Sequence, residues 1–105
     1  MIPLSVTTKS DNLVLLSGDL TFATITQKTV HLINFKKMNP RIVIDLAQIK
    51  SSDSAGLALL IEWLKISRIE QKQLRFNSIP AQLLTLAKLS GFEIELYFFE
   101  ADLNN

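Results

Sequence analysis

The run that most constrains the fold lies near the middle of the chain, where apolar residues precede a polar loop. Residues 41–46 read RIVIDL, so the centre of the run is β-branched and apolar without interruption. A strand with one exposed face alternates apolar and polar residues, whereas a continuous apolar run is typical of a strand covered on both faces, as in parallel sheets. We therefore expect this run to be a strand of a parallel sheet in an α/β domain.

Further elements follow from the periodicity and the turn signals on either side of this strand. Strands are also expected at residues 3–8, 13–17, 73–77 and 94–99, and helices at about 22–37, 54–71 and 81–90. The polar cluster KSDN at 9–12 makes a hairpin of the first two strands. The order β-β-α-β-α-β-α-β predicts an α/β fold with a mixed sheet of four or five strands, flanked by three helices that form right-handed crossovers.

Two of the expected helices have clear local signals. The first rests on apolar residues that follow the 3.6-residue helical period, namely Phe22, Ile25, Leu32 and Ile33. The last is bounded by Pro80, a residue suited to a first turn, and Gly91, a residue suited to the position after a helix end.

The middle helix carries apolar residues on two faces. One face should lie on the sheet and holds Leu57, Leu60, Ile61 and Leu64. At 100° per residue, a second stripe falls on nearly the opposite face and consists of Leu59, Trp63 and Ile66. A second body must cover that stripe, and both a neighbouring helix of the same domain and a partner protein stay open.

Composition excludes several classes of function. The 105 residues suit one domain over 1–105, with residues 100–105 as an exposed tail. The net charge of +1 gives no global field toward nucleic acid or anionic lipid, and the longest apolar stretch, Leu57 to Ile61, is far too short to insert in a membrane. Cysteine is absent and residues 1–12 lack the features of a signal peptide, so we expect a cytoplasmic protein.

The sequence offers little enzymatic chemistry. His31 is the single histidine, and no ligand type lies three or four residues from it, so no metal site is expected. A triad of Ser54, His31 and Asp45 or Asp53 can be assembled on paper, but Ser54 lies in no Gly-x-Ser-x-Gly elbow. No glycine-rich phosphate loop is present either. We therefore expect no catalysis, no cofactor and no small-molecule substrate.

The polar loop before the middle helix is the candidate site. Residues 51–56 read SSDSAG, and either Asp53 or Ser52 can cap the helix. Ser54, Ala55 and Gly56 then form a first turn whose small side chains leave the backbone N–H groups open. A phosphate on Ser54 would face those donors and the positive end of the helix dipole. Residue chemistry alone leaves open that the cluster only caps the helix.

Three stretches of the chain resemble the STAS domain family. Residues 42–65, IVIDLAQIKSSDSAGLALLIEWLK, are similar to the family signature of an apolar strand ending in Asp-Leu, a short loop, and Asp-Ser/Thr-x-Gly-Leu opening a helix. SGDLT at 17–21 resembles the family's Gly-Glu/Asp-Leu element. LLTLAKLSG at 83–91 resembles one branch, the small MlaB-like subunit of the Mla phospholipid-transport ABC system. The resemblance spans about 13–99.

The resemblance implies a protein-binding module. In the Mla branch the helix start docks on the ABC transporter ATPase subunit, which implies a non-catalytic regulatory subunit of a complex that moves phospholipid between inner and outer membrane. Carried over by position, the implied partner-binding residues are Asp53, Ser54, Ala55, Gly56 and Leu59. The implied location is cytoplasmic, peripheral to the inner membrane through the complex, with no contact to lipid, nucleotide or nucleic acid.

A second branch implies a different partner. In anti-sigma-factor antagonists the serine at the position of Ser54 is phosphorylated by a partner kinase that also acts as the anti-sigma factor. This chain has Ser54 where the Mla branch usually has Thr, and Ala55 where it often has Gly. Both departures keep a hydroxyl in place. The alternative is therefore an anti-sigma-factor antagonist regulated by phosphorylation at Ser54.

Overall fold

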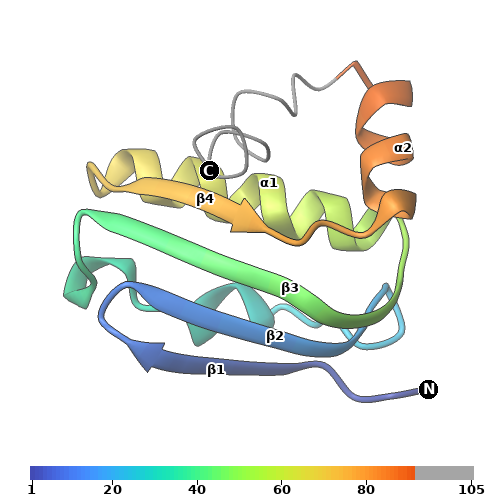
Figure 1. The fold of residues 1–105 in the computed structure, drawn as a ribbon, viewed down its shortest axis with the longest axis horizontal. Helices are drawn as coiled ribbons and strands as arrows, with labels where there is room; N and C mark the ends of the chain where they lie inside the picture. The colour runs from blue at the N-terminus through green and yellow to red at the C-terminus, as the bar shows by residue number, and fades with distance from the viewer. Residues whose placement is uncertain (92–105) are drawn as a thin grey trace.

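The computed structural model describes residues 1–91, which form four strands and two α-helices with two short 3₁₀-helices between them. In chain order these are β1 (Ser5–Ser10), β2 (Leu13–Leu20), η1 (Thr29–Leu32), η2 (Phe35–Lys37), β3 (Arg41–Ser52), α1 (Ser54–Ile69), β4 (Gln73–Asn77) and α2 (Ala81–Leu89) (Figure 1). The strand expected at 94–99 and the tail expected at 100–105 lie outside the described residues.

The sheet has the mixed topology that the sequence predicts. Its order is β1-β2-β3-β4, with β1 antiparallel to β2 and the remaining neighbours parallel. Val14, Ile44 and Phe76 pair across β2, β3 and β4 in one row, and all three are fully buried. The hairpin, the parallel half and the α/β class are thus confirmed.

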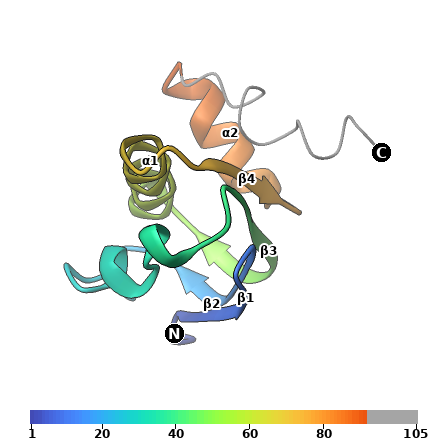
Figure 2. The ribbon, with the colours of Figure 1, turned by 90° about the vertical axis from the view of Figure 1, so that its left-hand side faces the viewer.

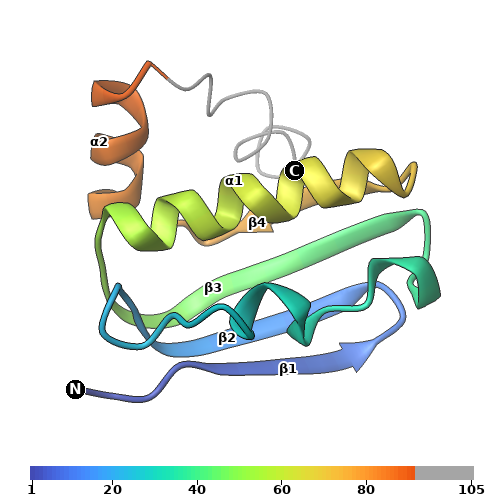
Figure 3. The same ribbon diagram turned by 180° about the vertical axis from the view of Figure 1, so that it is seen from behind.

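Helix α1 and the two 3₁₀-helices pack on one face of this sheet. Figure 2 shows α1 and the 3₁₀-helices on the same side of the strands, and Figure 3 shows η1 and η2 below α1 along its length. On β3, Ile42, Ile44 and Leu46 are buried, whereas Val43 and Asp45 are only half-buried. The expectation that both faces of this strand are fully covered was therefore wrong, because the described helices leave its second face partly exposed.

The α-helix expected at about 22–37 is absent, and two 3₁₀ turns, η1 and η2, occupy the segment instead. Threonine explains the difference, because its hydroxyl bonds to nearby backbone and competes with helical hydrogen bonds. The Thr24 Oγ1 donates to the Asp19 carbonyl at 2.6 Å, and the Thr29 Oγ1 accepts from the Thr26 N–H at 2.9 Å. The helical period was misleading as well, since Phe22 and Leu32 are exposed.

The second apolar stripe of α1 is covered from within the domain. Trp63 is fully buried, and its indole Nε1–H donates to the Val30 carbonyl in η1 at 3.0 Å. Leu59 is buried and Ile66 half-buried beside it. The question of which body covers this stripe is thus answered: the segment between β2 and β3 does so.

The two α-helices begin and end close to the expected residues. α1 starts at Ser54 as predicted and ends at Ile69, and α2 follows Pro80 and ends at Leu89. Gly91 follows α2 with a φ of +76°, and its N–H donates to the Lys88 carbonyl, as expected for glycine after a helix end. Among residues 1–91 no helix combines the length and apolarity of a membrane span.

The indole hydrogen bond yields a test of how the η1 segment is held. Trp63→Phe removes the donor to Val30 and part of the ring volume, so we expect a loss of roughly 1–3 kcal/mol in the free energy of unfolding. Urea unfolding measures this loss. It is followed by circular dichroism, because the variant has no tryptophan whose fluorescence could report unfolding. Lys65→Ala, on the exposed side of the same helix, should change stability by less than about 0.5 kcal/mol. If Trp63→Phe were as stable as the wild type, the indole hydrogen bond to Val30 would not hold the η1 segment.

Candidate functional site

Asp53, between β3 and α1, is the capping residue of α1. Its Oδ1 accepts from the N–H of Ala55 at 2.9 Å and from the N–H of Gly56 at 3.2 Å. Its own backbone is extended, and its carbonyl accepts the first helical hydrogen bond from Leu57. Of the two candidates for the cap, the structure selects Asp53. The hydroxyl of Ser52 is buried and has no hydrogen-bond partner among residues 1–91.

The capping bonds correct one expectation about the helix start. We expected the N–H groups of the first turn to stay open to an approaching anion, but Asp53 occupies those of Ala55 and Gly56. A phosphate on Ser54 would therefore meet a carboxylate that already uses these donors. The start of α1 therefore attracts an anion less strongly than the sequence indicates.

Asp53 also connects α1 to the end of β2. Its Oδ2 accepts from the Phe22 N–H at 3.1 Å, and its backbone N–H donates to the Leu20 carbonyl at 3.3 Å. Phe22 lies just after the end of β2 and is 31 residues from Asp53 along the sequence. The helix start and the loop after β2 therefore form one hydrogen-bonded junction.

Gly56 lets the helix approach this junction. It is buried, and a Cβ built on it would collide with the carbonyl oxygen of Leu20 and crowd the Leu20 side chain. Only glycine allows α1 to cross β2 so closely. The predicted contact of Gly56 with a partner stays a prediction, and its evident role is to place the first turn of α1 against β2.

The loop after β2 is closed by threonine. The Thr21 N–H donates to Thr24 Oγ1 at 3.2 Å, while the N–H groups of Thr24 and Ile25 donate to the Thr21 carbonyl. Within this turn Phe22 is 77 % exposed. Sequence reasoning missed Phe22 as a surface residue because it counted this side chain in a helical period. The signal against that helix was the number of threonines around it.

A shallow groove runs from the helix start along α1. It has a volume of about 460 Å³, and its walls are Ile25, Ala55, Ala58, Leu59, Ile61, Glu62 and Lys65. Of the five predicted site residues, Ala55 and Leu59 line this groove, Asp53 and the exposed Ser54 stand at its end, and Gly56 is buried beneath it. The structure thus brings a hydroxyl and small side chains together at the helix start, where the backbone N–H of the exposed Phe22 bonds to Asp53.

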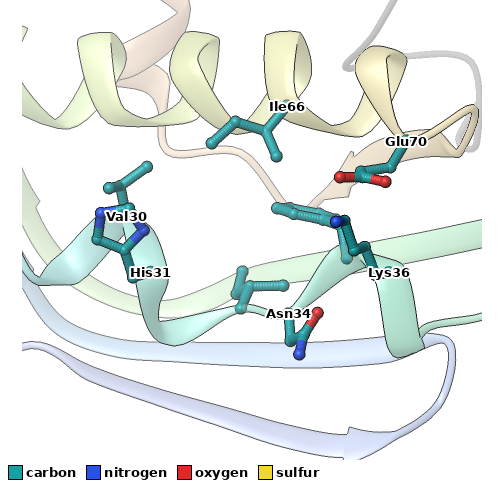
Figure 4. A pocket seen from close by; sticks show the side chains of 8 residues that line it. Val30, His31, Asn34, Lys36, Ile66 and Glu70 are labelled. Carbon is teal, nitrogen blue, oxygen red and sulfur yellow. The ribbon is translucent and has the colours of Figure 1, made fainter.

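His31 belongs to a different part of the surface. It lines a hollow of about 250 Å³ on the C-terminal half of α1, where Figure 4 shows it beside Val30, with Lys36 and Glu70 at the other end. Asp45 lies between buried Ile44 and Leu46 on β3, so it points to the other face of the sheet, and its Oδ1 accepts from the Ala47 N–H. The conceivable triad with Ser54 is not brought together. Residues 1–91 contain no group of acidic or histidine side chains arranged to hold a metal.

The carboxyl of Asp19, near the end of β2, has a lowered pKa. The Ile2 N–H donates to its Oδ2 at 2.9 Å, and this bond, followed by one from the Ser51 side chain, holds the pKa of Asp19 below its usual range. The Asp19 N–H in turn donates to the Ile2 carbonyl at 3.0 Å. These two hydrogen bonds between Ile2 and Asp19 hold the N-terminal segment beside the end of β2.

Comparisons with known proteins give a family and a fold. The family model described as "Mlab, STAS domain" matches residues 5–98. Among solved structures, the anti-sigma factor antagonist SpoIIAA in its unphosphorylated form is similar with a TM-score of 0.60 and 15 % identity, over 90 % of this chain and 86 % of that chain. At this identity the likeness shows the fold alone. No curated protein matches the sequence.

The close approach at Gly56 generates a test of the junction. Gly56→Ala should lower the free energy of unfolding by roughly 1–3 kcal/mol, because the added methyl group must displace α1 from the Leu20 carbonyl. Chemical denaturation measures the change. Ala58→Ser adds one atom at an exposed position of the same helix and should cost no more than about 0.5 kcal/mol. A Gly56→Ala variant as stable as Ala58→Ser would refute the close approach.

Proposed function

We propose, because the chain belongs to the MlaB-like STAS family, that it is a subunit that binds and regulates the ATPase of an ABC transporter moving phospholipid between inner and outer membrane. The family match makes the chain a regulatory domain that acts by binding protein and belongs to no enzymatic family. The proposal goes further than the family match in three respects: the ATPase partner, the role in transport, and the position on the cytoplasmic side of the inner membrane.

The proposed docking surface consists of Phe22, Asp53, Ser54 and Ala55, and the buried Leu59 forms the floor of the groove beside them. Protein interfaces concentrate their binding energy in a few well-packed residues, among which aromatic side chains are enriched. Phe22 is the only described aromatic residue with a largely exposed side chain, and its backbone N–H donates to Asp53 at the helix start. A partner side chain can enter the groove along Ala55 and Leu59.

One observation carries the proposal. The residues that match the family signature at the helix start lie at the end of an apolar groove of about 460 Å³, and the backbone of the exposed Phe22 is hydrogen-bonded to one of them, Asp53. Exposed apolar surface of this kind is costly in water unless a partner covers it. Among residues 1–91, Ser54 is not brought together with His31 or Asp45 at this surface.

An anti-sigma-factor antagonist is the second candidate, favoured by one feature of Ser54. Its side chain is exposed at the start of α1 and has no hydrogen bond within residues 1–91, so a kinase can reach it. Phosphorylation would place a dianion beside the Asp53 carboxylate and weaken a docked complex through like-charge repulsion. In this candidate the same surface binds the kinase.

Substitution of Ser54 tests the docking surface. Ser54→Arg places a long cation in the interface, so we expect its affinity for the cognate ATPase subunit to fall at least about tenfold. Isothermal titration with the purified proteins measures this. Ser10→Arg is the matched control, since it makes the same exchange at an exposed position at the other end of the sheet. If Ser54→Arg bound the ATPase subunit as tightly as the wild type, the proposed docking surface would be wrong.

Phe22 allows a second test of the same surface. Phe22→Ala should weaken ATPase binding by roughly 30-fold, the scale of a central aromatic residue in an interface. Because the side chain is 77 % exposed, its loss should leave the urea midpoint of the free protein nearly unchanged. Binding equal to that of the wild type would show that Phe22 lies outside the interface.

Kinase treatment separates the two candidates. Incubation of the chain with a co-encoded serine kinase and ATP, followed by intact-mass measurement, should show no added phosphate if the ATPase proposal is right. A mass increase that Ser54→Ala abolishes would favour the antagonist. The kinase must be active on another substrate in the same assay.

A further inference from the structure

We infer that Asp53 is a positioning residue, whose carboxylate holds Phe22 in the conformation that docks on the partner. The inference rests on the proposed function for its partner, and it adds how the docking surface is kept in shape. The carboxylate would act through Phe22 without itself supplying the main contact. The helix start and the aromatic residue would therefore function as one unit.

The two oxygens of the carboxylate serve two different segments. Oδ1 accepts from the N–H groups of Ala55 and Gly56, in the first turn of α1. Oδ2 accepts from the N–H of Phe22, in the loop after β2, at 3.1 Å. A residue that only capped the helix would need a single acceptor. The second oxygen is the part of Asp53 that capping leaves unexplained.

Phe22 depends on its backbone for its position. Its side chain is 77 % exposed, so little packing fixes it, and within residues 1–91 the side-chain hydrogen bonds of Thr24 connect this turn only to Thr21 and Asp19. The bond to Asp53 joins that turn to α1. Affinity rises when a loop is already held in its bound conformation, because binding then costs less ordering.

Asparagine separates the two roles of this carboxylate. Asp53→Asn keeps one carbonyl oxygen, and asparagine is as good a helix cap as aspartate. With that oxygen turned to Ala55 and Gly56, the side-chain amide faces the Phe22 N–H, donor against donor. The variant should therefore keep α1 capped and release Phe22. Asp53→Ala, by contrast, loses the cap and the tether together.

The first measurement needs no partner. In the isolated full-length protein we expect the Phe22 amide hydrogen of Asp53→Asn to exchange at least about tenfold faster than in the wild type, because its acceptor is gone. The amides of Leu59, Leu60 and Trp63 in α1 should keep their protection, and the urea midpoint should stay near that of the wild type. An unchanged exchange rate at Phe22 would overturn the tether.

The second measurement uses the ATPase subunit and a double-mutant cycle. Asp53→Asn should weaken binding by about five- to tenfold. If the carboxylate acts through Phe22, the double variant Phe22→Ala/Asp53→Asn should bind no more weakly than Phe22→Ala alone. Additive losses, or wild-type affinity of Asp53→Asn despite faster exchange, would overturn the positioning role. Failure of the wild-type chain to bind the ATPase would instead refute the proposed function, while the exchange data would still decide the tether.

Discussion

The fold depends on how closely α1 can approach the end of β2. Gly56 makes the approach sterically feasible, and the backbone N–H of Asp53 bonds to the carbonyl of Leu20 at the point of crossing. Once α1 lies there, Leu60 and Leu64 reach the sheet while Trp63 faces the η1 segment. The placement of α1 therefore determines both the apolar core and the proposed docking surface.

The proposed docking surface is assembled from segments that are distant in sequence. One part comes from the loop after β2 and the other from the start of α1, and backbone hydrogen bonds of neutral groups to one carboxylate join them. Hydrogen bonds to a charged acceptor are stronger than those between neutral groups. A surface built this way presents an aromatic side chain without burying it, which suits a domain whose family acts by binding other proteins.

How much could be predicted depended on whether the signal was local. The strand at 73–77 has the predicted bounds, and α1 begins at the predicted Ser54 with Asp53 as its cap, because periodicity and capping act over a few residues. The segment 22–37 was mispredicted, since threonine hydroxyls bonded to nearby backbone in place of a helical ladder. The bond from Phe22 to Asp53 spans 31 residues, and nothing in either local sequence indicates it.

The irregular segment between β2 and β3 also bears on how such domains can diverge. A helix there would have to keep its apolar period, so an inserted or deleted residue would rotate its buried face out of the core. Short turns closed by side chains carry no such period and tolerate changes of length. Because Ile25 in this segment lines the groove beside α1, a change of length here would reshape the groove while the sheet and its row of buried residues stay the same.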